Sequence, residues 1–205
     1  MGRPAKFTRD RILDAAAALA GEGGVASITM ASIAGQLGGP VGSMYHRFPS
    51  RDLLLAALWL RTVGRFQEGL LTALAAGDLE AAALHTPRWC RAHPVEAALL
   101  VRHTGEALVP RWPMELAADR EQVNSALLDA LRSFADRRAD IDYERTVFAI
   151  VDVPYGAVRR HLLADQAVPG HLDELIIATC RAVLALPPLD PGVGGDSAVP
   201  SASNP

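Results

Sequence analysis

The chain has 205 residues, of which 50% are hydrophobic, and a net charge of −3. This length allows one domain with a substantial core and a second, smaller one. No apolar run approaches the roughly 20 residues that span a bilayer, and no secretory signal follows the first charged residues. Cys90 and Cys180 fit neither a disulfide framework nor a zinc motif. We therefore expect a cytoplasmic protein without a membrane segment, a metal or a cofactor.

The charge is divided unevenly along the chain. Residues 1–65 have a net charge of +4, whereas residues 66–205 have a net charge of −7. A basic segment on an acidic body predicts a local binding site for a polyanion such as nucleic acid. The alternative is a chance variation of surface charge.

The residue pattern predicts an all-α fold. Ala, Leu, Arg and Glu dominate segments of helical length, and alternating β-branched runs are missing. Thr8, Thr29 and Ser50 are suitable N-caps, and glycines follow the expected helix ends. The expected helices cover about 9–21, 30–37, 40–47, 51–76, 78–92, 95–107, 113–138, 142–164 and 170–186. Pro87 and Pro154 should each kink or break a helix, and residues 187–205 should be disordered.

The two short helices at 30–37 and 40–47 are joined by a glycine turn, which is typical of a helix-turn-helix. In this motif the second helix enters the major groove of DNA while the first helix supports it. Met44 and Phe48 form an apolar side that can hold the second helix in place. Its other side contains Val41, Gly42, Ser43, Tyr45, His46 and Arg47, which offer small, hydroxyl and basic groups to phosphates and base edges.

The runs "RILDAAAALAGEGGVASITMASIAGQLG" and "GSMYHRFPSRDLLL" resemble the DNA-binding domain of the TetR (tetracycline repressor) family of bacterial transcriptional regulators. The resemblance covers roughly a quarter of the chain. It implies a helix-turn-helix domain at 1–53, a helical regulatory and dimerisation domain at 54–186, and a tail at 187–205. It also implies a homodimer on double-stranded DNA with a palindromic operator.

The resemblance assigns roles to particular residues. Thr29, Ser43, Tyr45 and Arg51 match positions that commonly contact phosphates, and Val41 and Gly42 match positions that face the groove. His46 and Arg47 are further candidates for DNA contacts, and Arg3 and Lys6 lie in a leader that either binds DNA or is solvated. The sequence departs from the family pattern at Leu37, Gly39, Pro40 and Val41, where Ala, Val, a polar residue and a polar or basic residue are usual.

The later helices suggest a dimer interface and a ligand site. A broad apolar face at 170–186, together with an apolar helix at 147–163, is suited to a four-helix interface between two copies. The residues of this face are Leu172, Leu175, Ile176, Thr179, Val183 and Leu186. Candidates for an effector pocket are Trp89, His103, Trp112, Phe134, Phe148, Asp152 and Tyr155. Aromatic residues of this kind belong more often to the core than to a ligand site, and Asp152 would need a partner if it were buried, either an Arg or a cationic effector.

These observations predict a homodimeric repressor that a small-molecule effector releases from DNA. The alternative is a regulator of the same fold that responds to no ligand or to a protein partner. No Walker, GxSxG, HExxH or GxGxxG motif occurs, so the sequence does not indicate an enzyme.

Overall fold

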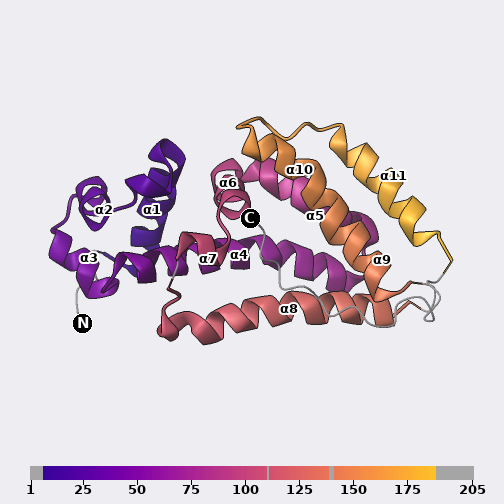
Figure 1. The fold of residues 1–205 in the computed structure, drawn as a ribbon, viewed down its shortest axis with the longest axis horizontal. Coiled ribbons are helices and arrows are strands. Elements are labelled where there is room, and N and C mark those ends of the chain that lie inside the picture. The colour runs from indigo at the N-terminus through magenta and orange to yellow at the C-terminus, as the bar shows by residue number, and fades with distance from the viewer. Residues whose placement is uncertain (1–6, 110, 139–140, 188–205) are drawn as a thin grey trace.

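The computed structural model describes residues 7–109, 111–138 and 141–187, and within these ranges every regular element is helical, which confirms the all-α prediction (Figure 1). The first elements are α1 (Arg9–Gly23), η1 (Val25–Ser27), α2 (Met30–Leu37), α3 (Val41–Arg47) and α4 (Arg51–Ala76). They are followed by α5 (Leu79–Ala92), α6 (Pro94–Arg102), α7 (Gly105–Leu108), η2 (Met114–Leu116) and α8 (Ala117–Asp136). The last elements are α9 (Tyr143–Val147), the π-helical η3 (Phe148–Asp152), α10 (Val153–Leu163) and α11 (Leu172–Leu184). The expected disordered tail lies, except for Pro187, outside the described residues.

Three helices begin at the N-caps expected from the sequence, Thr8, Thr29 and Ser50. The Thr8 hydroxyl accepts a hydrogen bond from the Arg11 amide, and the Ser50 hydroxyl accepts one from the Leu53 amide. Thr29 and Ser32 form a reciprocal capping box at the start of α2. Such caps each contribute about 1 kcal/mol by satisfying amides that have no partner within the helix.

Three local features differ from the predicted helices. Thr104 caps α7 by accepting from the Ala107 amide, so the expected helix at 95–107 is divided at His103 into α6 and α7. A kink or a break is expected at Pro87; the residue lies inside α5, which continues past it without a break. Pro154 follows the π-helical turn of η3. Because proline cannot donate to the preceding turn and its ring crowds that turn's carbonyl, a wider turn accommodates it.

α1, α2, α3 and the start of α4 share one hydrophobic core at the end of the molecule (Figure 1). Ile12, Ile33, Met44 and Phe48 are completely buried in it. Leu99, Leu108 and Val109 from the α6–α7 region belong to the same cluster. The N-terminal helices are thus packed directly against the body, and α4 continues from one into the other as a single helix of 26 residues.

The body contains two further clusters, one around α5, α10 and α11 and one around α4, α5 and α8. Leu172 and Ile176 are buried inside the first cluster, whereas Leu175 and Leu186 are 58% and 55% exposed. The broad apolar face expected at 170–186 is thus shared between the body's own core and its surface. No helix of the described ranges is long and apolar enough to cross a membrane.

Candidate nucleic-acid interface

The turn between α2 and α3 is set by Gly38. This residue adopts a left-handed conformation (φ 61°, ψ 43°), and its amide donates to the carbonyls at the end of α2. A side chain is unfavourable in this conformation, which explains why glycine occurs here. Pro40 then precedes the first turn of α3, where its fixed φ of −71° suits a helix start. Two short helices are thereby joined by a tight, defined turn.

α3 has one buried side and one exposed side. Met44 and the adjoining Phe48 are fully buried, whereas Val41 and Tyr45 are 39% and 51% exposed. Gly42 and His46 are also exposed, and Ser43 and Arg47 are half-buried. The outward set coincides with the predicted DNA contacts.

The departure from the family pattern at Gly39 has a structural explanation. A Cβ atom at this position would overlap the aromatic ring of Phe7, which lies directly over the glycine. Phe7 is also packed against the N-terminal core. The small residue at 39 is therefore paired with a large one that precedes α1, a relation that local sequence rules do not contain.

Arg9 connects α1 to the end of α3, a role that sequence reasoning missed. Its Nη1 donates to the Arg47 carbonyl at 3.1 Å, and its guanidinium lies 4.2 Å from the centre of the Phe48 ring. A cation at the C-terminal end of a helix is favoured by the helix dipole. Arg9 thereby fixes the end of α3 against the rest of the N-terminal core.

Arg51, a predicted phosphate contact, is engaged within the protein. Its Nε donates to the Ile28 carbonyl at 2.7 Å and its Nη2 donates to the Val25 carbonyl at 2.9 Å. The side chain thus holds the segment that leads into α2. Thr29 is exposed at the start of α2, where its hydroxyl takes part in the capping box. Arg3 and Lys6 lie outside the described residues.

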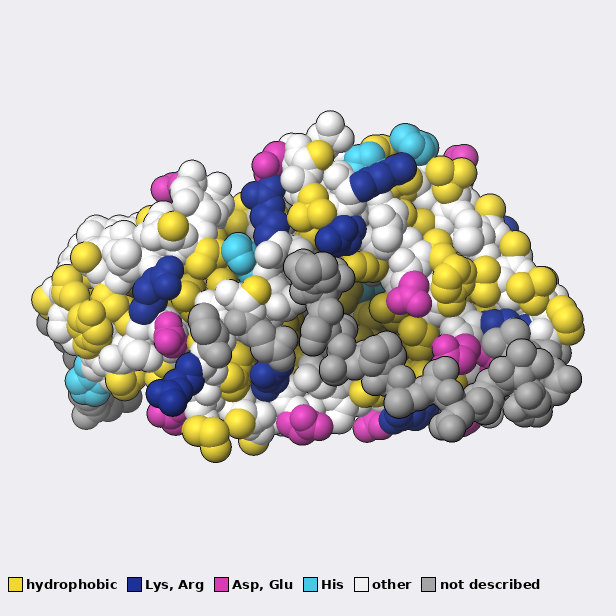
Figure 2. Space-filling view, in the orientation of Figure 1, with side chains coloured by type: hydrophobic (Ala, Val, Ile, Leu, Met, Phe, Trp, Pro, Cys, Tyr) yellow, Lys and Arg dark blue, Asp and Glu magenta, His cyan; other side chains and the backbone are white. Residues whose placement is uncertain are grey.

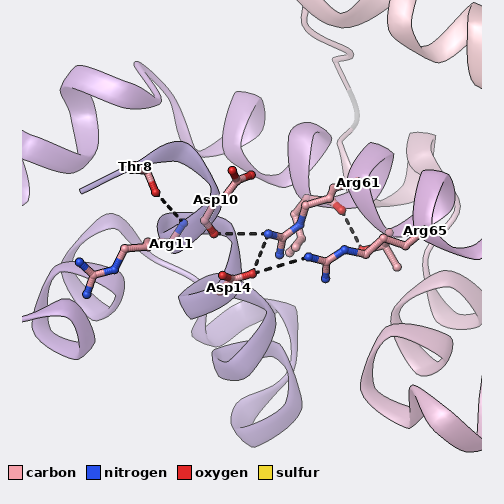
Figure 3. A network of polar contacts seen from close by, with 8 residues as sticks. Thr8, Asp10, Arg11, Asp14, Arg61 and Arg65 are labelled. Carbon is pink, nitrogen blue, oxygen red and sulfur yellow. Dashed lines mark hydrogen bonds and ion pairs between the residues drawn. The ribbon is translucent and has the colours of Figure 1, made fainter. Parts of the chain in front are cut away.

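A polar network joins α1 to the middle of α4 (Figure 3). Arg61 Nη1 lies 2.7 Å from Asp14 Oδ1 and also donates to the Asp10 carbonyl at 3.3 Å. Arg65 approaches the same carboxylate oxygen at 4.0 Å. The Arg61 side chain is 15% exposed and that of Asp14 60% exposed, so solvent screens the pair and its contribution to stability is small. Its position is more informative, since it links an N-terminal helix to the body.

The proposed effector-pocket residues do not surround one cavity. Trp89 and Phe134 are buried in two different core clusters. Phe148 and Tyr155 are 48% and 44% exposed, and Asp152 is exposed as well, so its carboxylate needs no buried partner. The aromatic content of a segment cannot distinguish core from surface or from pocket.

The two remaining candidates lie near the junction with the N-terminal helices. The Trp112 ring packs edge-on against Trp59, and its Nε1 donates to the Leu116 carbonyl. The His103 carbonyl accepts from Trp59 Nε1, and burial lowers the pKa of the His103 imidazole. His103 lines a cavity of about 240 Å³ between α1 and α6.

A larger groove of about 660 Å³ lies between α4 and α8. Its lining is Ala57, Leu60, Arg61, Gly64, Gln67, Glu68, Leu71, Leu116, Asp119, Gln122, Val123 and Ala126. Arg61 therefore belongs both to this groove and to the network with α1. Sequence reasoning missed the groove, because its residues are individually ordinary for exposed helices.

The cysteines and histidines form no reactive centre in the described ranges. Burial raises the pKa of the Cys90 and Cys180 thiols to about 11, so their reactive thiolate forms are scarce at neutral pH. Within the same ranges no group of three or more His, Cys, Asp and Glu side chains is placed to hold a metal ion.

A short supporting helix, a tight turn and a second helix with an outward polar side define the helix-turn-helix class of DNA-binding proteins. Residues 12–58 match the model of the family described as bacterial regulatory proteins, tetR family. The resemblance predicted from the sequence is thereby confirmed over the segment that carries it. No curated protein matches the sequence.

Several solved structures share the fold of this chain. FadR from Bacillus subtilis, solved in complex with stearoyl-CoA, is 17% identical with a TM-score of 0.63, and the match covers 87% of this chain and 98% of FadR. A TetR-family member from Streptomyces coelicolor A3 is 19% identical with a TM-score of 0.62, covering 91% and 100%. The multidrug binding protein EbrR, complexed with imidazole, is 17% identical with a TM-score of 0.60, covering 91% and 98%.

Proposed function

We propose that this chain is a homodimeric transcriptional repressor that binds a palindromic operator through α3 and is released by a small-molecule effector. The observation that carries the proposal is the division of α3 into a fully buried side and an exposed side with Val41, Gly42, Tyr45 and His46. This is the arrangement that a recognition helix requires, because its inner side must be fixed while its outer side meets base edges and phosphates.

We assign Ser43, Tyr45 and Thr29 to phosphate contacts and Val41 and Gly42 to the floor of the major groove. A valine can contact a thymine methyl group, and the neighbouring glycine permits close approach. His46 and Arg47 complete the outward side of α3, and Arg3 and Lys6 belong to a leader that approaches the duplex. Arg51 holds the segment before α2 through its Nε and Nη2, and we assign its Nη1 to a phosphate contact. Nη1 makes no hydrogen bond to a described residue and is therefore available for that contact.

Dimerisation through α10 and α11 is the second part of the proposal. Large apolar side chains are exposed along this region: Phe148, Tyr155, Leu163, Leu175 and Leu186. Figure 2 shows hydrophobic side chains gathered over the end of the molecule where α10 and α11 lie. Pairing these helices with those of a second copy buries that surface in a four-helix interface. It would place two α3 helices on successive major grooves, about 34–36 Å apart.

The third part concerns regulation. We divide the chain into a DNA-binding domain at 1–53, a regulatory and dimerisation domain at 54–186 and a tail at 187–205, with α4 crossing the first boundary unbroken. Two structural neighbours are FadR in complex with stearoyl-CoA and the multidrug binding protein EbrR, which favours an effector over the ligand-independent alternative. An effector bound between α4 and α8 would contact Arg61, whose side chain also pairs with Asp14 of α1. Binding in the groove would therefore be able to change the position of α1.

Selection of bound duplexes from a random DNA library tests this proposal. We expect an enriched palindrome whose two half-sites are centred about one helical turn apart, or a multiple of it. The same duplex should lose affinity for the Tyr45→Ala variant. Enrichment of no sequence, or retention of full affinity by this variant, would contradict the assignment of α3 as the recognition helix.

A further inference from the structure

The groove between α4 and α8 is formed by two helices that run side by side in the same direction (Figure 1). Near their beginnings the Trp59 and Trp112 rings are in contact, and near their ends Arg137 Nη2 donates to the Leu74 carbonyl at 2.6 Å. Between these two contacts the helices leave the groove of about 660 Å³ open. The groove is therefore bounded at both ends by fixed contacts.

The residues that line the groove carry more negative than positive charge, with two acids and one arginine. Arg61 is the cation among the lining residues, and Asp14 of α1 already pairs with it at 2.7 Å. Glu68 on α4 and Asp119 on α8 are exposed and form no ion pair with a described residue. Asp119 has a local reason to occur in the first turn of α8, where the helix dipole favours an acid. Glu68, in the middle of α4, has no such reason.

Gln67 provides an independent indication of a ligand. Only 7% of this residue is exposed, yet its side-chain amide makes no hydrogen bond with any described residue. The amide atoms themselves keep some exposure, because among the described residues the fully buried side-chain atoms without a partner are Arg61 Nε and Asp173 Oδ1. Since Gln67 lines the groove, its remaining exposure is to the groove, and a molecule bound there can pair with the amide.

Gly64 keeps the middle of the groove wide. A Cβ atom built on Gly64 meets no atom within 4 Å, whereas one on Gly69 would lie 2.6 Å from the His85 ring. Gly69 is thus required by packing against α5, but Gly64 is not required by any described neighbour. Glycine in a helix interior lowers helix stability. An unfilled position of this kind is suited to a site that must accept a bulky group.

We propose that the groove binds an organic cation with an apolar body. Its charge lies near Glu68 and Asp119, and its apolar part packs against Leu60, Leu71 and Val123. The inference rests on the proposed function, since it names the chemistry of the effector. An anionic ligand such as a fatty acyl-CoA would add negative charge beside both carboxylates, and although Arg61 Nε has no partner, the Nη1 of the same guanidinium is already paired with Asp14.

Isothermal titration calorimetry of the full chain without DNA tests this proposal with two probes of the same shape and opposite charge. We expect tetraphenylphosphonium to bind at least about tenfold more tightly than tetraphenylborate, because each carboxylate attracts one ion and repels the other. Added salt should reduce the difference. Equal affinities, tighter binding of tetraphenylborate or no binding of the phosphonium ion would overturn the proposal.

Variants locate the site. Glu68→Gln combined with Asp119→Asn should reduce the affinity for tetraphenylphosphonium by roughly tenfold, and Gly64→Leu should abolish it by filling the groove. Glu121→Gln is the matched control, because Glu121 is exposed on α8 but does not line the groove. Thermal unfolding verifies that each variant is folded. Unchanged binding by the double variant or by Gly64→Leu would overturn the assignment.

Fluorescence anisotropy with the selected DNA separates this inference from the proposed function. Loss of the DNA complex on adding tetraphenylphosphonium, but not with Gly64→Leu, supports both. If the phosphonium ion does not bind while the chain binds its palindrome, the groove chemistry fails and the DNA-binding function remains. If it binds in the groove without affecting the DNA complex, the groove chemistry is supported and release by this class of effector is overturned.

Discussion

Tyr45 is the residue of α3 whose side chain offers most to a partner, since 51% of it is exposed beside the buried Met44. We expect Tyr45→Phe to weaken DNA binding by a factor of about five, because the hydroxyl contact to a phosphate contributes on the order of 1 kcal/mol. The loss should be similar for all sequences, since phosphate contacts carry no sequence information. Anisotropy titrations with selected and scrambled duplexes measure it. An unchanged affinity would remove the hydroxyl from the interface.

Gly39 and Phe7 form a pair whose members depend on each other. Gly39→Val should destabilise the protein by about 1–3 kcal/mol, because the added side chain overlaps the Phe7 ring and forces it away. Urea unfolding measures the change. The double variant Gly39→Val with Phe7→Ala should recover part of this loss, since the overlapping ring is gone. A double variant that shows only the sum of the two single losses would contradict the direct contact.

Arg51 has a structural and a functional consequence that can be separated. Arg51→Ala should lower the free energy of unfolding by about 1–3 kcal/mol, because the Ile28 carbonyl loses the Arg51 donor and the Val25 carbonyl keeps only the Ile28 amide. Measured well below the unfolding transition, the slope of log affinity against log salt should decrease by about one, because one phosphate contact is lost. Unaltered stability would argue against the first role, and an unaltered slope against the second.

At the scale of elements, α4 connects the N-terminal helices to the groove in the body. It begins at the Ser50 cap beside α3, carries Arg61 toward α1 and lines the groove with α8. A continuous helix of 26 residues transmits a displacement along its length more directly than a loop would. Movement of α4 toward or away from α8 would therefore change the position of α1 and α3.

The two interior glycines of α4 provide the test of its packing. Gly64→Ala should stabilise the protein by about 0.5–1 kcal/mol, since alanine favours the helix and its methyl group meets open space. Gly69→Ala should destabilise it, because the methyl group would meet the His85 ring at 2.6 Å. The His85 ring is itself fixed by a 2.6 Å hydrogen bond between its Nε2 and the Phe66 carbonyl. Chemical denaturation of both variants measures the contrast, and equal effects would contradict it.

The elements also mark the limit of prediction from sequence. Thr8, Thr29 and Ser50 set helix starts that local rules identify, and Met44 and Phe48 are buried as their spacing indicates. The contacts of Phe7 with Gly39 and of Arg51 with Val25 join residues that are distant along the chain. Helical spacing alone cannot assign Phe148 to the surface and Phe134 to the core, because that choice depends on which helices become neighbours.

At the scale of the whole molecule, the exposed apolar side chains of α10 and α11 predict the oligomeric state. Leu175→Glu should shift the protein from dimer to monomer, because a carboxylate would be placed within the interface without a partner. Leu128→Glu on α8 is the matched control, as Leu128 is 42% exposed but lies outside this face. Light scattering after gel filtration measures the mass of each variant. A Leu175→Glu protein that remains dimeric would place the interface elsewhere.

The most direct test of the central claim is the number of chains bound to one selected duplex, measured by sedimentation equilibrium or native mass spectrometry. Two chains should bind the full palindrome together, and a duplex with one scrambled half-site should bind far more weakly, because each α3 contacts one half-site. Binding of a single chain to the full palindrome, or equal affinity for the scrambled duplex, would contradict a homodimeric repressor.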